Sequence, residues 1–117
     1  MKVLLIDDST VVRSRLVRLL EDLGDIDVEE ADDAPVALDS LRRARPDAVI
    51  LDIRLRTSSG LEVLREIKRA DSPPLVIMLT NHASEHHRRY CQKNGADYFF
   101  DKTREFEKVL DVLAQRR

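Results

Sequence analysis

Five short runs of apolar residues recur along the chain, and a segment with helical spacing follows each of them. The runs cover residues 2–6, 26–30, 47–52, 75–79 and 98–100. The third and fourth runs contain unbroken apolar stretches, which are typical of strands that are buried on both faces of a parallel sheet. The second run alternates apolar and polar residues, so it predicts an edge strand.

The first helical segment shows its periodicity most clearly. Its apolar stripe has the spacing of a helix that packs on a core, and it consists of Val12, Leu16, Leu19, Leu20 and Leu23. Asp8 and Ser9 can cap the start of this helix, and Gly24 can end it. Asp32 or Asp33 offers a similar cap for the second helix.

The later helical segments repeat this pattern less regularly. Leu61, Leu64 and Ile67 share one face of a helix that follows the loop ending at Gly60. Residues 84–94 predict a polar helix with a weak apolar face. The last helix is expected to carry an apolar face made of Phe106, Val109, Leu110 and Leu113.

Strands and helices therefore alternate strictly, with no repeat and no linker. Right-handed crossovers then place five strands in one parallel sheet with helices on both faces. The sequence predicts a single α/β domain of the doubly wound type, which spans residues 1–117. With 117 residues, the chain is long enough to bury a core without disulfides.

Composition narrows the range of functions. The 20 basic and 22 acidic side chains are scattered and give a net charge of −2, so we expect no direct binding to nucleic acid. The arginine pairs are interpreted as solvated helix faces. The single cysteine, Cys91, cannot form an internal disulfide, which favours a reducing compartment. No apolar run is long enough for a signal peptide or a membrane span, so we expect a soluble cytoplasmic protein.

Polar residues follow four of the predicted strands at the points where these strands end. They are Asp7 and Asp8 after the first strand, Asp52 after the third, Thr80 after the fourth and Lys102 after the fifth. Because the carboxyl ends of parallel strands lie along one edge, these side chains can share one face. Crowded carboxylates repel one another unless a cation lies among them, and oxygen ligands suit Mg²⁺ better than Zn²⁺. A lysine and a threonine opposite them would suit a phosphoryl group.

The order and spacing of these residues resemble the receiver domains of two-component response regulators, from residue 2 to about residue 113. The positions that carry the resemblance are Asp7-Asp8, Leu51-Asp52, Gly60, Thr80, Gly95-Ala96-Asp97 and Lys102. The resemblance implies a flavodoxin-like sheet with the strand order 2-1-3-4-5. It also implies that Asp52 accepts a phosphoryl group from a phosphohistidine or a small acyl phosphate.

The same resemblance implies roles for the surrounding residues. Asp8, Asp52 and the backbone carbonyl of Arg54 would ligate Mg²⁺, and Asp7 would act through water. Lys102 would pair with one phosphoryl oxygen, and Thr80 would bind another after the domain switches. Phe99 matches the aromatic switch position, and the fourth helix, fifth strand and fifth helix would form the output surface.

Several residues around the site depart from the pattern of the family. Thr103 follows Lys102 where the family often has proline, frequently as a cis peptide, so the cis proline cannot be carried over. Arg56 also occupies a position where proline is usual. Arg54 and His82 occupy positions that tune the lifetime of the phosphorylated state. Asn81 is larger than the usual alanine or glycine, and we predict that it slows hydrolysis of the acyl phosphate. An unchanged lifetime in Asn81→Ala would contradict this prediction.

The expected function is a stand-alone receiver that switches on phosphorylation and is not a turnover enzyme. Its partners would be a sensor histidine kinase or a histidine phosphotransfer protein, together with an unidentified downstream protein. The chain would be a monomer or a phosphorylation-dependent dimer that contacts no membrane. A small Mg²⁺-dependent phosphotransferase or phosphatase is one alternative, and a receiver-like module that binds partners without phosphorylation is another. His82 and His86 lie one helical turn apart, but they are interpreted as a solvated face because no third ligand is evident.

Overall fold

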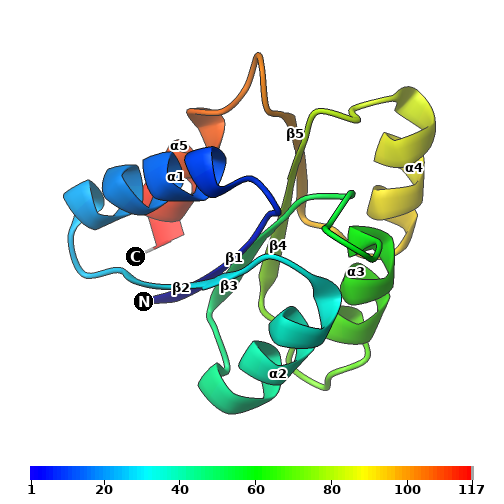
Figure 1. Cartoon of the computed structure of the whole chain (residues 1–117), viewed down its shortest axis with the longest axis horizontal. Coiled ribbons are helices and arrows are strands. Elements are labelled where there is room, and N and C mark those ends of the chain that lie inside the picture. Colours follow the sequence, from blue (N-terminus) through cyan, green and yellow to red (C-terminus); the bar gives the residue numbers. More distant parts are fainter. Residues whose placement is uncertain (117) are drawn as a thin grey trace.

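A five-stranded parallel sheet forms the centre of the molecule (Figure 1). The computed structural model describes residues 1–116. The strands are β1 (Lys2–Ile6), β2 (Asp27–Ala31), β3 (Ala48–Leu51), β4 (Leu75–Thr80) and β5 (Tyr98–Asp101). All neighbouring pairs are parallel, and the order across the sheet is β2-β1-β3-β4-β5. The predicted fold class and strand order are both confirmed, and each end of a strand differs from the expected one by at most one residue.

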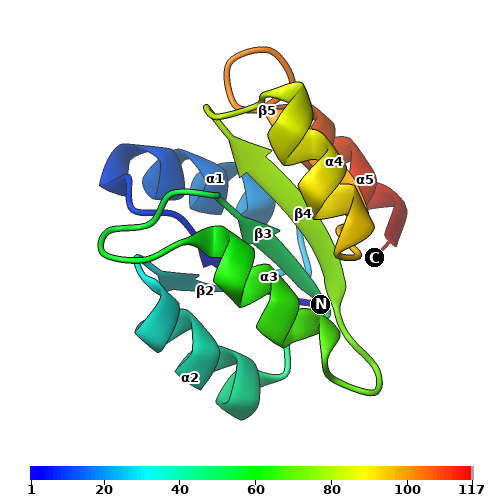
Figure 2. The same ribbon diagram turned by 90° about the vertical axis from the view of Figure 1, so that its right-hand side faces the viewer.

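Helices cover both faces of this sheet. They are α1 (Thr10–Leu23), α2 (Ala34–Ala44), α3 (Gly60–Lys68), α4 (Glu85–Lys93) and α5 (Lys108–Arg116). Helices α1 and α5 lie on one face, and α2, α3 and α4 lie on the other (Figures 1 and 2). Within residues 1–116, no helix is both long enough and apolar enough to cross a membrane.

The core is divided by the sheet into two clusters. Leu4 and Ile6 of β1 pack toward α2 and α3, whereas Val3 and Leu5 pack toward α1 and α5. This alternation follows from the two-residue repeat of a strand. Strands β3 and β4 are buried along their whole length, but β2 at the edge exposes most of its side chains at least partly. The apolar runs therefore predicted the central and the edge positions correctly.

The first two helices begin in different ways. Ser9 caps α1, because its hydroxyl accepts a hydrogen bond of 3.2 Å from the backbone N–H of Val12. Asp33 stands at the corresponding position of α2, but its side chain makes no capping hydrogen bond. The prediction that the Asp33 side chain caps α2 is therefore wrong, although Asp33 does occupy the cap position. The carboxylate of Asp33 binds residues of a distant loop instead, as described below.

The last helix begins later than expected, at Lys108. Turns occupy residues 102–107, because the Asp101 carboxylate accepts a 2.7 Å hydrogen bond from the Thr103 N–H and the Asp101 carbonyl accepts one from the Glu105 N–H. Phe106 thus lies before α5, although its side chain is still buried. The guanidinium of Arg15 on α1 covers this ring at 4.3 Å from its centroid.

Candidate functional site

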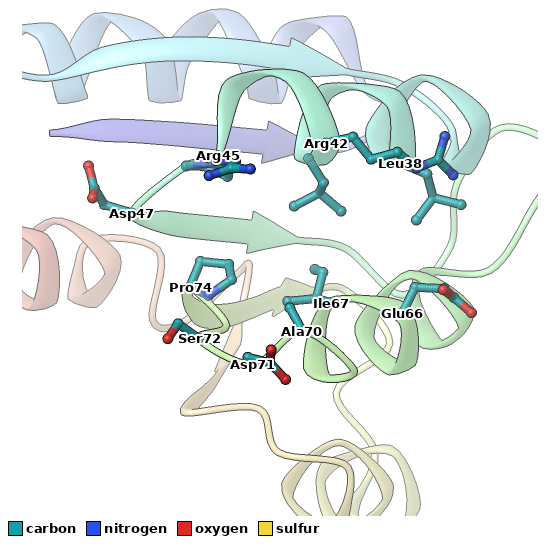
Figure 3. A pocket seen from close by; sticks show the side chains of 12 residues that line it. Leu38, Arg42, Arg45, Asp47, Glu66, Ile67, Ala70, Asp71, Ser72 and Pro74 are labelled. Carbon is teal, nitrogen blue, oxygen red and sulfur yellow. The ribbon is translucent and has the colours of Figure 1, made fainter.

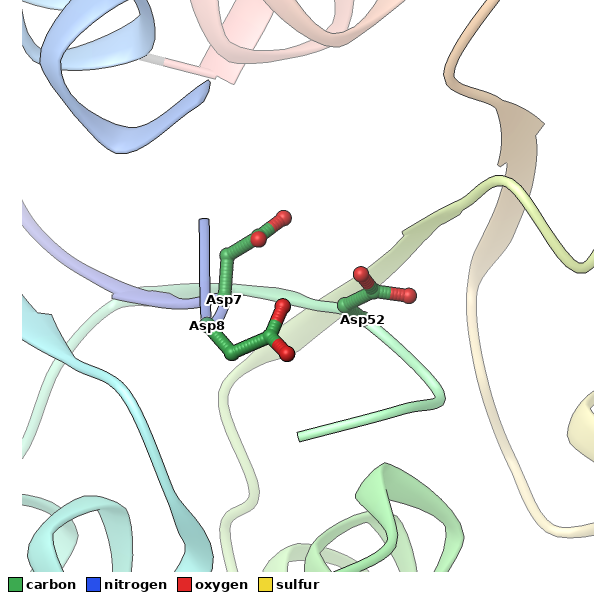
Figure 4. Close-up of side chains that lie close together, drawn as sticks. All are labelled: Asp7, Asp8 and Asp52. Carbon is green, nitrogen blue, oxygen red and sulfur yellow. The ribbon is translucent and has the colours of Figure 1, made fainter. Parts of the chain in front are cut away.

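Three carboxylates meet where β1 and β3 end (Figure 4). Asp7 and Asp8 follow β1, Asp52 follows β3, and one oxygen of each lies within 4.8 Å of the others. The sheet register explains this convergence, because Ile6 pairs with Leu51 and the Asp52 N–H donates to the Ile6 carbonyl at 3.0 Å. Asp7 and Asp52 are buried and Asp8 is exposed. This is the only cluster of three or more potential metal ligands within residues 1–116.

Lys102 joins this cluster from the loop after β5. Its ammonium lies 2.8 Å from Oδ2 of Asp52 and 2.5 Å from Oδ2 of Asp7. Burial alone would lower the pKa of Lys102, but the hydrogen bonds to Asp52 and Asp7 outweigh it and raise that pKa. The lysine therefore remains charged. All peptide bonds of the described residues are trans, including Lys102–Thr103.

The Asp7 carboxyl is held in an environment that disfavours its charge. Burial raises its pKa above the ordinary value, although the Lys102 ammonium and the Ser9 N–H partly offset the effect. Three carboxylates thus face a single ammonium, and their donor atoms are all oxygen. A hard divalent cation such as Mg²⁺ would fit this donor set and would balance the remaining charge.

Asp52 is fixed by its backbone surroundings as well as by Lys102. Its Oδ1 accepts a 2.7 Å hydrogen bond from the Ile53 N–H. Gly60, at the start of α3, lies so close that a Cβ there would come within 1.8 Å of the Asp52 carbonyl oxygen. Only glycine fits this approach. The Gly60 N–H also donates to the Ile53 carbonyl at 2.6 Å, which closes the loop.

Thr80 and Phe99 occupy neighbouring strands beside this cluster. Thr80 ends β4, is fully buried, and accepts a 3.0 Å hydrogen bond on its hydroxyl from the His82 N–H. Phe99 in β5 is buried in the core on the side of α3 and α4. Arg88 of α4 covers the Phe99 ring at 4.8 Å from its centroid and donates to the Phe99 carbonyl at 3.1 Å. The switching roles expected for Thr80 and Phe99 remain predictions.

Two further arginines lie around the cluster. Arg54, two residues after Asp52, is exposed and pairs with Ser59 through an isolated backbone bridge. The metal-ligand role of its carbonyl stays a prediction. Arg13 was not singled out by the sequence, yet its Nη1 donates to the Asp7 carbonyl at 2.5 Å and its Nε pairs with Glu30. An arginine on an amphipathic helix carries no local signal for such a contact.

A separate cavity of about 840 Å³ lies between α2 and α3 (Figure 3). It is lined by Leu38, Leu41 and Ile67 and by residues that precede β3 and β4, such as Pro46 and Pro74. It therefore lies at the amino edge of the sheet, whereas the carboxylate cluster lies at the carboxyl edge. None of the predicted site residues lines it.

Comparison with known proteins identifies the family. The family model of the response regulator receiver domain matches residues 3–114. The chain belongs to this receiver family. It is 32% identical to the chemotaxis protein CheY of Halobacterium salinarum over 113 residues, which cover 97% of this chain and 93% of that protein. The receiver resemblance drawn from the sequence is thus confirmed.

Other receiver relatives are longer than this chain. A protein-glutamate methylesterase/protein-glutamine glutaminase of Anaeromyxobacter dehalogenans is 43% identical over 76 residues, which cover 65% of this chain but only 22% of that protein. A solved response regulator from Burkholderia pseudomallei superposes with a TM-score of 0.86 at 26% identity, covering 98% of this chain and 72% of that one. That structure contains a phosphorylated aspartic acid, a calcium ion and citrate.

Proposed function

We propose that this receiver is a phosphorylation-dependent switch of two-component signalling in which Asp52 accepts the phosphoryl group. The observation that carries the proposal is the position of Asp52, which is 5% exposed at the end of β3 between the Lys102 ammonium and two other carboxylates. Membership of the receiver family supports phosphoryl acceptance in general. The donor would be a phosphohistidine of a sensor histidine kinase or of a histidine phosphotransfer protein.

Mg²⁺ would be held by Asp8, Asp52 and the Arg54 carbonyl, with Asp7 acting through water. When bound, the ion offsets the negative charge that the attacking carboxylate and the phosphoryl oxygens bring together. The all-oxygen donor set and the raised pKa of Asp7 support this assignment. An ion there would favour the charged form of the buried Asp7 carboxyl.

The residues of the chain would carry the transfer as follows. A carboxylate oxygen of Asp52 attacks phosphorus, the phosphorus–nitrogen bond of the donor breaks, and its electron pair stays on the imidazole nitrogen. The Lys102 ammonium already contacts Asp52, so a short movement would bring it to a phosphoryl oxygen. The Thr80 hydroxyl, which accepts a hydrogen bond from the His82 N–H, would donate one to a second phosphoryl oxygen.

The output of the switch would be read on the face formed by α4, β5 and α5. Phe99 connects this face to the site, because its strand β5 pairs with β4, which ends in Thr80. Movement of Thr80 would change the packing around the Phe99 ring and its contact with Arg88. A downstream protein that binds this face would then distinguish the two states.

Intact-mass measurement after incubation with Mg²⁺ and a small acyl phosphate tests the proposal. We expect one addition of about 80 Da on the wild-type chain, and none on Asp52→Asn. Asp39→Asn serves as the matched control, because it changes an exposed aspartate of α2 far from the cluster. Absence of the addition, or continuous release of phosphate from a phosphate ester, would contradict the switch, and the second result would favour a phosphatase or phosphotransferase.

A further inference from the structure

The loop that follows Asp52 is closed by its own backbone hydrogen bonds. It covers residues 53–59 and connects β3 to α3. The Leu55 N–H donates to the Ser58 carbonyl at 3.1 Å, and Arg54 bridges to Ser59. These bonds give the loop a definite shape, and the buried side chains of Ile53 and Leu55 hold its first half in the core.

The second half of the loop is held by the residues at the start of α2. Oδ1 of Asp33 accepts a 3.0 Å hydrogen bond from the Thr57 N–H, and the hydroxyls of Thr57 and Ser58 both donate to the same carboxylate. The Ser58 hydroxyl in turn accepts a 3.0 Å bond from the Ala34 N–H, which makes it the cap of α2. The hydrogen bonds from Ser58 and Thr57 hold the pKa of Asp33 well below its usual range.

Asp32 adds a second attachment beside the first. The Arg56 N–H donates to the Asp32 carbonyl at 3.3 Å, and the Arg56 guanidinium lies 3.6 Å from the Asp32 carboxylate. A proline at position 56 would restrict the backbone but could not donate this hydrogen bond. In this chain the loop is therefore held by polar contacts to α2.

Asp33 is unusual among these contacts because it is buried and binds the loop more strongly than its own helix. It is only 5% exposed, and its carboxylate serves the loop while Ser58 supplies the cap that Asp33 could have made. A carboxylate that only stabilised α2 would be expected to bind the N–H groups of that helix. The contacts of Asp33 instead tie Thr57 and Ser58 of the loop to the start of α2.

We propose that Asp33 is a positioning residue for the phosphorylation site, holding the 53–59 loop so that Asp52 and the Arg54 carbonyl keep the arrangement that binds Mg²⁺. The inference rests on the proposed function, because it assumes that this cluster is the metal and phosphoryl site. Asp33 itself would touch neither the ion nor the phosphoryl group. Outer contacts of this kind commonly set metal affinity by orienting the ligands.

Two measurements on Asp33→Ala test the inference without relying on activity. Amide hydrogen exchange of Thr57 in the metal-free protein should become about tenfold faster, since its N–H loses a charged acceptor. The Kd for Mg²⁺, followed by amide NMR shifts, should rise by about tenfold. Asp33→Asn should restore most of the affinity for Mg²⁺. Its side-chain carbonyl can accept the hydrogen bond from the Thr57 N–H, and the Thr57 hydroxyl can turn to accept one from its side-chain NH₂ group.

Ser40→Ala is the matched control, since Ser40 is buried on the same helix and makes no hydrogen bond to the loop. It should leave both measurements unchanged. An Mg²⁺ Kd within about twofold of wild type in Asp33→Ala, or an equal loss in Ser40→Ala, would overturn the positioning role. If Asp33→Ala fails to fold, Thr57→Val replaces it, because it removes one of the three donors to Asp33 and keeps the side-chain shape. The Kd for Mg²⁺ should then rise by less than in a full loss of the carboxylate, and an unchanged Kd would overturn the positioning role.

The proposed function can fail separately from this inference. A wild-type chain that binds no Mg²⁺ and accepts no phosphoryl group would refute the proposed function and the positioning role together. Normal binding and phosphorylation in the wild type, with unchanged Mg²⁺ affinity in Asp33→Ala, would refute the positioning role alone.

Discussion

The Lys102 ammonium contacts both buried carboxylates of the site and balances part of their negative charge. One positive charge faces three negative ones, of which Asp8 alone is exposed to solvent. Breaking such a buried pair leaves an uncompensated charge, so Lys102 cannot leave Asp52 without another partner for both groups. A phosphoryl group and a cation, arriving together, would supply these partners. If Asp52 is the phosphoacceptor, as proposed, movement of Lys102 would then depend on phosphorylation.

The thiol of Cys91 allows a test of how the burial of a single titratable group affects stability. Its side chain is fully buried on the inner face of α4, and burial raises the pKa of the thiol from about 9 to about 11. Between these values the unfolded chain loses the thiol proton while the folded chain keeps it, so the stability that this group contributes is lost as the pH rises. Denaturant titrations from pH 8 to 10.5 should show a decline in the free energy of unfolding. In Cys91→Ala this decline should be shallower, by at most about 1.4 kcal/mol per pH unit. Equal slopes in the two proteins would contradict the prediction.

Among the secondary-structure elements, α3 is the one whose start is most tightly constrained by the site. Its first residue, Gly60, packs directly on the backbone of Asp52, so the helix and the proposed phosphoacceptor hold each other in place. Gly60→Ala would drive a methyl group into the Asp52 carbonyl. We expect a loss of about 3 kcal/mol in the free energy of unfolding, together with slower phosphorylation. Chemical denaturation and intact-mass kinetics would measure the two effects.

A control on the same helix separates this clash from a general effect on α3. Glu62→Ala changes a side chain in the first turn that is exposed to solvent. It should leave phosphorylation unchanged and shift stability by less than about 0.5 kcal/mol. A Gly60→Ala protein as stable and as reactive as Glu62→Ala would show that the backbone can relax around the methyl group.

The elements also show how far the sequence could predict the structure. The central strands were predicted well because their apolar runs are unbroken, and α1 because its long apolar stripe agrees with the residues that cap it. Convergence of Asp7, Asp52 and Lys102 followed from the rule that parallel strands end at one edge. The predicted start of α5 was wrong, because the turns after Asp101 depend on specific polar contacts that hydrophobic periodicity does not reveal. The partners of Asp33 lie 24 and 25 residues away, so no local pattern could have indicated them.

On the scale of the whole molecule, the fold places an unfavourable cluster of charges on a well-packed support. Helices pack on both faces of the sheet, and the two cores hold β1 and β3 in register. The raised pKa of Asp7 means that its contribution to stability is present at low pH and is lost as the pH rises through that pKa. Above the pKa of Asp7, the metal-free protein therefore keeps this buried carboxyl ionised at a cost in stability. Burial of the strands offsets this cost and keeps the site assembled.

A cation that binds the folded cluster should recover this stability for the molecule as a whole. At a Mg²⁺ concentration 100 times the Kd, the free energy of unfolding should rise by about 2.7 kcal/mol, with a higher Tm. Asp8→Ala should abolish most of the increase, because it removes a ligand whose exposed side chain contributes little to packing. Thermal unfolding with MgCl₂, and with NaCl at equal ionic strength, measures the effect. If Mg²⁺ stabilised Asp8→Ala as much as the wild type, the ion would bind elsewhere, because the stabilisation would not depend on the carboxylate cluster.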